Sequence, residues 1–295
     1  MTTSVTVRVS ATTANLGPGF DSLGMALDIT QEVVVSVGGS GPAGGLDGLS
    51  RLALDAARSA YRLARVEVPG LAASGAGPTI PIGRGLGASA AARAAGIVGA
   101  NTLLGGMLSD DQMLALGAGL EGHADNMAPA LFGGLRVVVR AEDRYVHVAA
   151  PVAPGLKVVL FVPDFEMPTN ESRKLLPQQL SKDDAVYNIG RAALLVAALG
   201  QGRWDVLDEA TQDRLHQPPR VQLFKAMPEV FAAAKDAGAL CAYLSGGGST
   251  IAAFTVERED EIAAAMQKAA YLGGYNGSTL VTVPSGAGAV VVRED

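Results

Sequence analysis

The chain has 295 residues, of which 48% are hydrophobic and 18% charged, which is enough apolar material for one large domain or two of ordinary size. A formal net charge of −6 argues against a nucleic-acid-binding surface, and the single cysteine, Cys241, excludes an intrachain disulfide and a multi-cysteine metal site. No apolar run reaches the roughly 18 residues needed to span a bilayer. We therefore expect a cytoplasmic protein with a small-molecule partner, and neither a nucleic acid nor a membrane as partner.

Strand-like and helix-like segments alternate along the chain, which predicts a mixed α/β composition. Clustered or alternating β-branched residues indicate strands at 5–9, 32–37, 135–140, 157–162, 242–245, 250–254 and 287–292. Helix-forming residues at helical spacing indicate helices at 52–64, 88–104, 110–120, 184–199, 204–209, 228–237 and 258–272. The prolines of 149–155 favour a division into two domains, 1–152 and 153–295.

The stretch PIGRGLGASAAARAAG, residues 81–96, joins a glycine-rich loop directly to an Ala-rich helix. Gly83, Gly85 and Gly87 let the backbone adopt positive φ and turn its N–H groups toward a ligand, and the free N–H groups of the following helix start attract anions. Ser89 can offer its hydroxyl to a metal ion that accompanies bound phosphates. No Gly-Lys-Ser/Thr follows, so this is not a Walker loop. By itself the stretch could equally be a turn that caps a buried helix.

Two further stretches carry polar groups beside flexible backbone. SATTANLGPGFDSLGMAL, residues 10–27, offers Asn15 and Asp21 directly after the first strand, which suits recognition of an amine, although a turn with an Asp cap is the simpler alternative. EGHADNMAPALFGG, residues 121–134, places four polar side chains within six residues, where carboxylates could hold Mg²⁺ or an ammonium group. A surface loop is the alternative there. These four side chains are Glu121, His123, Asp125 and Asn126.

A fourth stretch, YLSGGGSTIAAF at 243–254, interrupts a strand with three glycines, which favours close approach of a ligand or another backbone. Together the four stretches resemble the homoserine kinase family, a branch of the small-molecule kinases that include galactokinase, mevalonate kinase and phosphomevalonate kinase. The resemblance also covers TNESRKLLP, AVYNIGRAALLVAAL and LHQPPR, and so spans nearly the whole chain. It implies an α+β fold with an N-terminal domain like ribosomal protein S5 domain 2, a C-terminal ferredoxin-like domain, and ATP between them.

The resemblance further implies phosphorylation of the side-chain hydroxyl of L-homoserine by ATP with Mg²⁺, giving O-phospho-L-homoserine for threonine biosynthesis. Ser89 and Glu121 would hold the metal. Asn126 would contact the reacting hydroxyl, and Asp125 and His123 would line the same pocket. The triphosphate would lie on Pro81, Gly83, Arg84, Gly85, Leu86, Gly87, Ala88, Ser89 and Ala90. The amino acid would be held by Asn15 and Asp21 on the amine, by Arg173 and Arg220 on the carboxylate, and by Thr169 and Gly247 from the second domain.

Several alternatives remain open in the sequence. Asp125 could act as a general base, whereas Asn126 could instead orient the hydroxyl without accepting its proton. His216 could be a pocket wall or a structural hydrogen-bond partner. Arg51 stands about where the family has an Asn near the adenine, so nucleotide preference could differ. The chain could also be another kinase of the superfamily that acts on a different small alcohol, or a catalytically weak regulator, and it could form a homodimer.

Overall fold

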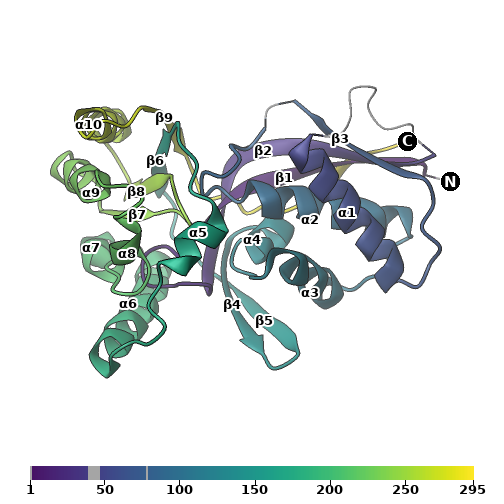
Figure 1. Cartoon of the computed structure of the whole chain (residues 1–295), viewed down its shortest axis with the longest axis horizontal. Coiled ribbons are helices and arrows are strands. Elements are labelled where there is room, and N and C mark those ends of the chain that lie inside the picture. Colours follow the sequence, from purple (N-terminus) through teal and green to yellow (C-terminus); the bar gives the residue numbers. More distant parts are fainter. Residues whose placement is uncertain (1, 39–46, 78) are drawn as a thin grey trace.

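The computed structural model describes residues 2–38, 47–77 and 79–295, and it contains two antiparallel sheets, each with its own helices (Figure 1). This mixed architecture confirms the predicted α+β fold class. In the described part of the chain, no helix combines the length and the apolar composition that crossing a membrane would require.

The first sheet has the strand order β10-β1-β2-β4-β5, with β3 paired to β2. Val5, Val7 and Val9 of β1 are fully buried because alternate residues of a strand face the same side. Helices α1 and α2 pack against each other so closely that a Cβ at Gly96 would lie 2.1 Å from the carbonyl oxygen of Ala53. The elements up to the middle of the chain are β1 (Ser4–Ala14), β2 (Leu23–Val37), α1 (Gly48–Leu63), β3 (Leu71–Ala76), α2 (Ala88–Leu103), α3 (Asp110–Glu121), α4 (Met127–Phe132), β4 (Leu135–Ala141) and β5 (Arg144–Ala150).

The second sheet has the strand order β7-β8-β6-β9 and packs against α9 and α10 around buried Phe161, Phe224 and Met266. The last strand, β10 (Val290–Glu294), leaves this part and pairs antiparallel with β1. The division at 152/153 stays a prediction. The remaining elements are β6 (Lys157–Pro163), α5 (Thr169–Lys174), α6 (Lys182–Gln201), η1 (Trp204–Val206), α7 (Leu207–Ala210), α8 (Gln217–Arg220), α9 (Met227–Asp236), β7 (Cys241–Leu244), β8 (Ile251–Thr255), α10 (Glu259–Leu272) and β9 (Gly277–Thr282).

Every strand and helix predicted from the pattern overlaps an observed element, but several observed elements were not predicted. The sequence LAASGA of β3 has no β-branched residue and so carries no strand signal, whereas β5 (RYVHVAA) and β9 (GSTLVT) do contain β-branched residues that favour a strand. The helices α4, α5 and α8 have six residues or fewer, which is too short for a helical period to show. Two of these short helices nevertheless carry candidate site residues.

Candidate active site

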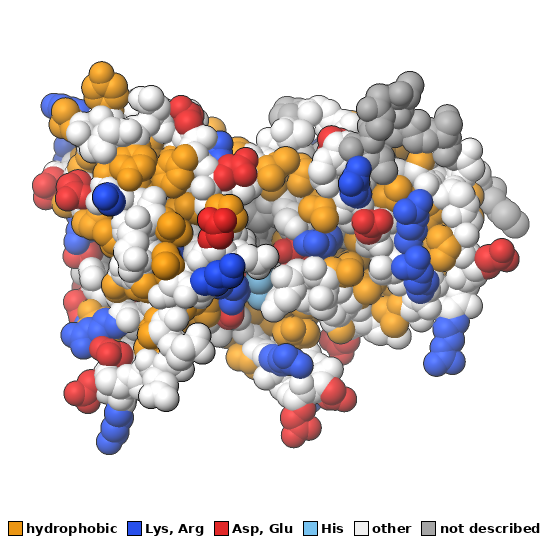
Figure 2. All heavy atoms as spheres, viewed as in Figure 1, with side chains coloured by type: hydrophobic (Ala, Val, Ile, Leu, Met, Phe, Trp, Pro, Cys, Tyr) orange, Lys and Arg blue, Asp and Glu red, His pale blue; other side chains and the backbone are white. Residues whose placement is uncertain are grey.

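A cavity of about 300 Å³ lies where the two halves of the molecule meet, and the surface in Figure 2 is hollowed at this junction. The predicted site residues come from distant parts of the chain, yet most of them line this one cavity. Two do not: Asp21 and the side chain of Arg84. The predicted residues that line it are Asn15, Pro81, Gly83, Gly85, Leu86, Gly87, Ala88, Ser89, Ala90, Glu121, His123, Asp125, Asn126, Thr169, Arg173, Arg220 and Gly247.

The glycine-rich loop ends in the N-terminus of α2, and its first helical N–H groups have no side-chain cap. Gly87, the N-cap residue, has φ 67°, and a Cβ there would lie 1.9 Å from Thr12 Oγ1. Gly85 has φ 76°, and a Cβ there would lie 2.2 Å from the carbonyl oxygen of Ser245. Only glycine fits both positions without displacement. The loop is therefore a rigid cradle of N–H groups at a helix start, which suits a polyphosphate.

Arg84 belongs to this loop by its backbone, but its side chain does not face the cavity. Its Nη2 donates to the carbonyl oxygen of Asp164 at 2.6 Å, and its Nη1 lies 3.7 Å from Oε1 of Glu166. The guanidinium thus ties the loop to the segment that follows β6. The backbone of Arg84 accepts a hydrogen bond from Thr250 N at 2.9 Å.

At the other side of the cavity, Arg173 of α5 and Asp21 form a bidentate ion pair with distances of 2.9 and 2.5 Å. The hydrogen bond from Arg173 to Asp21 raises the pKa of that guanidinium above its ordinary value. Asn15 connects this pair to the second half of the molecule, because its Oδ1 accepts from Asp21 N and its Nδ2 donates to Gly246 O at 2.8 Å. Asp21 does not line the cavity itself, but it contacts Arg173 and Asn15, which do.

Arg220 is the most buried charged side chain of the cavity, with 1% of its surface exposed. Its Nη1 contacts His216 Nδ1 at 2.8 Å and Gly246 O at 3.2 Å, while its Nε has no hydrogen-bond partner among the described residues. Burial, with the nearby charge of Arg173, lowers the pKa of Arg220 to about 10. No carboxylate in the described part of the chain lies within 4.0 Å of it. The carboxylates of Asp21, Asp213 and Asp125 act on it only from farther away. A buried guanidinium without a direct ion pair favours an anionic ligand, because its charge is only partly compensated.

His216 contacts the guanidinium of Arg220 but does not line the cavity. Its ring is fully buried, its Nε2 lies 2.6 Å from Gly17 O, and its Nδ1 faces Arg220. A carbonyl oxygen and a guanidinium on opposite sides select the neutral ring with its proton on Nε2. The structure therefore assigns His216 to the structural hydrogen-bond role, and burial lowers its pKa to about 4.

This low pKa predicts an acid-sensitive fold. The unfolded chain binds a proton at His216 near pH 6.5 and the folded chain only near pH 4, so the stability from the neutral ring is complete above pH 6.5 and is lost as the pH falls toward 4. We expect His216→Gln to remove about 2 kcal/mol of the stability difference between pH 7 and pH 5. Urea unfolding at both pH values measures it, and an unchanged difference would contradict the assignment.

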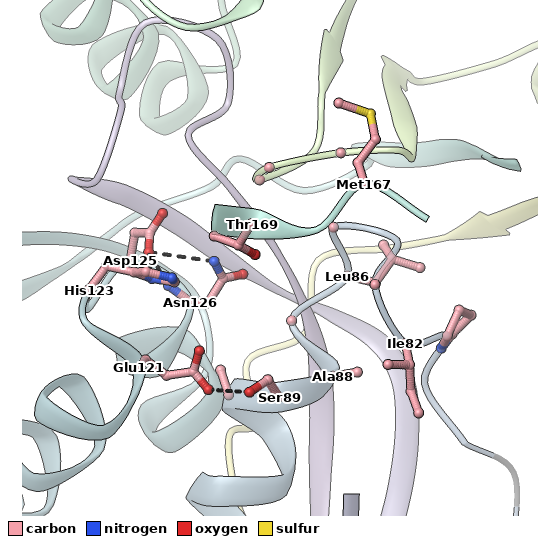
Figure 3. Close-up of a pocket in the computed structure, with 18 of the residues that line it drawn as sticks. Ile82, Leu86, Ala88, Ser89, Glu121, His123, Asp125, Asn126, Met167 and Thr169 are labelled. Atoms are coloured by element: carbon pink, nitrogen blue, oxygen red, sulfur yellow. Dashed lines mark hydrogen bonds and ion pairs between the residues drawn. The ribbon is translucent and has the colours of Figure 1, made fainter. Parts of the chain in front are cut away.

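His123, Asp125 and Asn126 form a polar cluster on one wall of the cavity (Figure 3). Asp125 Oδ1 lies 2.7 Å from His123 Nδ1 and accepts from Asn126 N at 2.9 Å. Burial alone would lower the pKa of His123, but the hydrogen bond and charge of Asp125 outweigh it and raise that pKa. Thr12 Oγ1 donates to Asn126 Oδ1 at 2.8 Å, a contact that the sequence did not reveal. Asn126 Nδ2 also lies 3.5 Å from Asp125 Oδ1, so one N–H of this amide has a weak partner and the other keeps free hydrogen-bonding capacity.

Ser89 and Glu121 also meet, as Figure 3 shows: Ser89 Oγ donates to Glu121 Oε1 at 2.6 Å. The described residues contain no group of three His, Cys, Asp or Glu side chains that could hold a metal by themselves. One hydroxyl and one carboxylate nevertheless fit Mg²⁺, which commonly takes one or two protein ligands together with substrate phosphates. Arg93, which the sequence did not single out, joins this pair.

Comparison with known proteins agrees with this fold. The GHMP kinases N-terminal domain model matches residues 51–134, and the GHMP kinases C-terminal model matches residues 195–272. The fold and the site thus define a GHMP-type kinase. The homoserine kinase of Moorella thermoacetica is 41% identical, with 97% of this chain and 99% of that protein covered, and that of Thermus thermophilus is 40% identical, with 92% and 94% covered.

A solved structure is similar over the same length. The crystal structure of homoserine kinase from Cytophaga hutchinsonii superimposes with a TM-score of 0.87 at 29% identity and covers 99% of this chain and 98% of that one. The chain belongs to the homoserine kinase family, as the motif resemblance predicted.

Proposed function

We propose that this protein transfers the γ-phosphoryl group of ATP to the side-chain hydroxyl of L-homoserine, a step of threonine biosynthesis. The observation that carries the proposal is the buried guanidinium of Arg220, which has no carboxylate within 4.0 Å among the described residues and lies in the same cavity as the glycine-rich helix start. A polyphosphate cradle and a separate grip for a small carboxylate are what phosphorylation of an amino acid requires. In the reaction the hydroxyl oxygen bonds to the γ-phosphorus, the bond to the bridging oxygen of ADP breaks, and the hydroxyl proton is released.

The triphosphate would lie on the N–H groups of residues 83–89, whose conformation the neighbouring chain holds in place. Thr12 N donates to Leu86 O at 3.1 Å, and Ser245 Oγ donates to Gly85 O at 2.6 Å. Ser89 and Glu121 would hold Mg²⁺. When bound, the metal would neutralise phosphate charge and help align the transferred group.

The amino acid would lie between the two arginines and the Asn15–Asp21 segment. Arg220 and Arg173 would take the carboxylate, since a planar guanidinium binds carboxylates in a bidentate manner. Asp21 and Asn15 would take the ammonium group. Asp21 and Arg173 already neutralise each other, and a zwitterionic ligand could exchange with both partners without leaving net charge buried. Thr169 and Gly247 would close the site from the second half of the molecule.

Asn126 would position the reacting hydroxyl without taking its proton. Thr12 occupies its amide oxygen and Asp125 Oδ1 accepts weakly from its Nδ2 at 3.5 Å, so the second N–H of the amide would donate to the hydroxyl oxygen or to a phosphate oxygen. Phosphoryl transfer depends mainly on alignment and charge neutralisation, and a strong base contributes little to it. Asp125 is engaged by His123 and by the backbone of Asn126, which favours a positioning role over that of a base.

Replacing Asp125 by Asn tests this division of roles. Asn retains an oxygen that can accept from Asn126 N but removes the charge, so we expect the KM for homoserine to rise about tenfold and kcat to fall less than tenfold. A general base would instead lose 10²- to 10⁴-fold in kcat. Steady-state kinetics distinguish the two outcomes, and Asp143→Asn, an exposed carboxylate in the β4–β5 turn, serves as the control.

The proposed reaction itself is tested by ADP release from Mg-ATP with L-homoserine, L-threonine, L-serine, mevalonate and galactose. We expect turnover with L-homoserine far above that with the others. Turnover with mevalonate or galactose instead would assign another reaction of the superfamily, and ATP binding without turnover would favour a regulatory role. The homodimer and the cytoplasmic location stay predictions.

A further inference from the structure

Arg93 lies at the position where a cation between Ser89 and Glu121 would be expected. It follows Ser89 by four residues in α2, so the two side chains share one face of the helix. Its Nη1 donates to Ser89 Oγ at 2.5 Å and also to Glu121 Oε1. A single guanidinium nitrogen therefore contacts both oxygens that the proposed function gives to the metal.

The contact is substantially removed from water. The side chains of Arg93 and Glu121 are 18% and 9% exposed, and Arg93 is the only cation within 4.0 Å of Glu121 among the described residues. A carboxylate buried to this extent needs a positive partner, and Arg93 supplies it. With Arg93 in place the negative charge of Glu121 is already neutralised, and a lone divalent ion would meet a fixed positive charge at close range.

A nucleotide changes this balance. Its phosphates bring negative charge to the start of α2, where they attract a divalent ion and offer the Arg93 guanidinium an alternative anionic partner. We propose that Arg93 occupies the cation position between Ser89 and Glu121 in the nucleotide-free protein, so that the divalent metal binds there only together with the nucleotide. The proposal rests on the proposed function for the identity of the metal ligands, and it adds an order of binding.

Binding of Mn²⁺, measured through the electron paramagnetic resonance signal of the free ion, tests the proposal without turnover. Arg93→Met removes the charge and keeps much of the apolar stem. Without nucleotide, we expect this variant to bind one Mn²⁺ at least about tenfold more tightly than the wild type. The gain should disappear in the double variant Arg93→Met/Glu121→Gln, which would locate it at Glu121.

The matched control is Arg8→Met, which breaks an Arg–Glu pair of 2.8 Å on the exposed side of the first sheet and makes the same change in net charge. It should bind Mn²⁺ like the wild type. Arg93→Gln, which keeps hydrogen-bonding capacity toward Glu121, provides a second uncharged variant if Arg93→Met does not fold. Tight Mn²⁺ binding by the wild type without nucleotide, or equal binding by wild type and the uncharged variants, would overturn the proposal.

Coupling between ADP and Mn²⁺ gives a second measurement. In the wild type each ligand should strengthen the other, by the same factor in either order, because the nucleotide favours the conformation in which Arg93 has left Glu121 and the metal binds only to that conformation. In Arg93→Met this factor should fall at least about tenfold, because the metal can then bind at Ser89 and Glu121 without the nucleotide. An unchanged factor would contradict the proposal. The result is independent of which alcohol is phosphorylated, so a failure of the homoserine assay would leave it intact.

Discussion

Replacing Arg220 by Met is expected to raise the KM for L-homoserine by roughly 30- to 1000-fold while the KM for ATP stays unchanged, because a charge-assisted grip on a carboxylate in a buried site contributes about 2–4 kcal/mol. Arg220 is 1% exposed and has no carboxylate partner among the described residues. Met fills much of the same volume, so the effect reports the charge and its hydrogen bonds. Steady-state kinetics with both substrates measure it.

A substrate without a carboxylate tests whether Arg220 contacts that group. 3-Amino-1-propanol is homoserine without its carboxylate, so it should be a poor substrate of the wild type and should lose nothing further in Arg220→Met. Equal losses for both substrates would show that Arg220 acts on the fold and not on the carboxylate. In the ligand-free protein, relief of the buried charge and loss of the hydrogen bonds to His216 Nδ1 and Gly246 O act in opposite directions, so the free energy of unfolding should change little. Urea unfolding checks this, with exposed Arg214→Met as the control.

Gly87→Ala is expected to lower kcat about 100-fold, because a small displacement of aligned groups has effects of that size. The new Cβ would lie 1.9 Å from Thr12 Oγ1 and 3.1 Å from Asn126 Oδ1. It would therefore break the hydrogen bond that orients Asn126 and push the loop away from the cavity wall. Kinetics at saturating concentrations of both substrates measure the loss.

Gly105, just beyond the other end of α2, provides the matched control. It has φ 72°, close to the 67° of Gly87, but a Cβ there would meet no atom within 4 Å. Gly105→Ala should thus carry the same backbone strain of about 1 kcal/mol with kcat unchanged. If both variants lose activity equally, strain in α2 is the cause, and the contact between the loop and Thr12 is not needed for catalysis.

The longer periodic elements were predictable from local sequence, whereas the short ones were not. Helices α2 and α6 show runs of helix-forming residues, and β1 and β6 show β-branched ones. The short helices α5 and α8 have no such signal, although they carry Arg173 and Arg220. Those two arginines were selected through the family resemblance, and their residue pattern alone would not have identified them.

The sequence by itself determined the glycine-rich loop, the helix that follows it, and the residue types available for a phosphate and an amino acid. These depend on backbone preferences within a few residues. Only the tertiary structure decided that Arg84 turns toward Glu166, that His216 stands behind Arg220, and that β10 returns to β1. The pairing of Arg93 with Glu121 was likewise decided only by the tertiary structure. The strand pairing joins residues up to 289 positions apart, from Val5 to Glu294. Such contacts depend on which distant segments the packing of the two halves brings together, because buried charges and backbone groups can pair only with partners within reach.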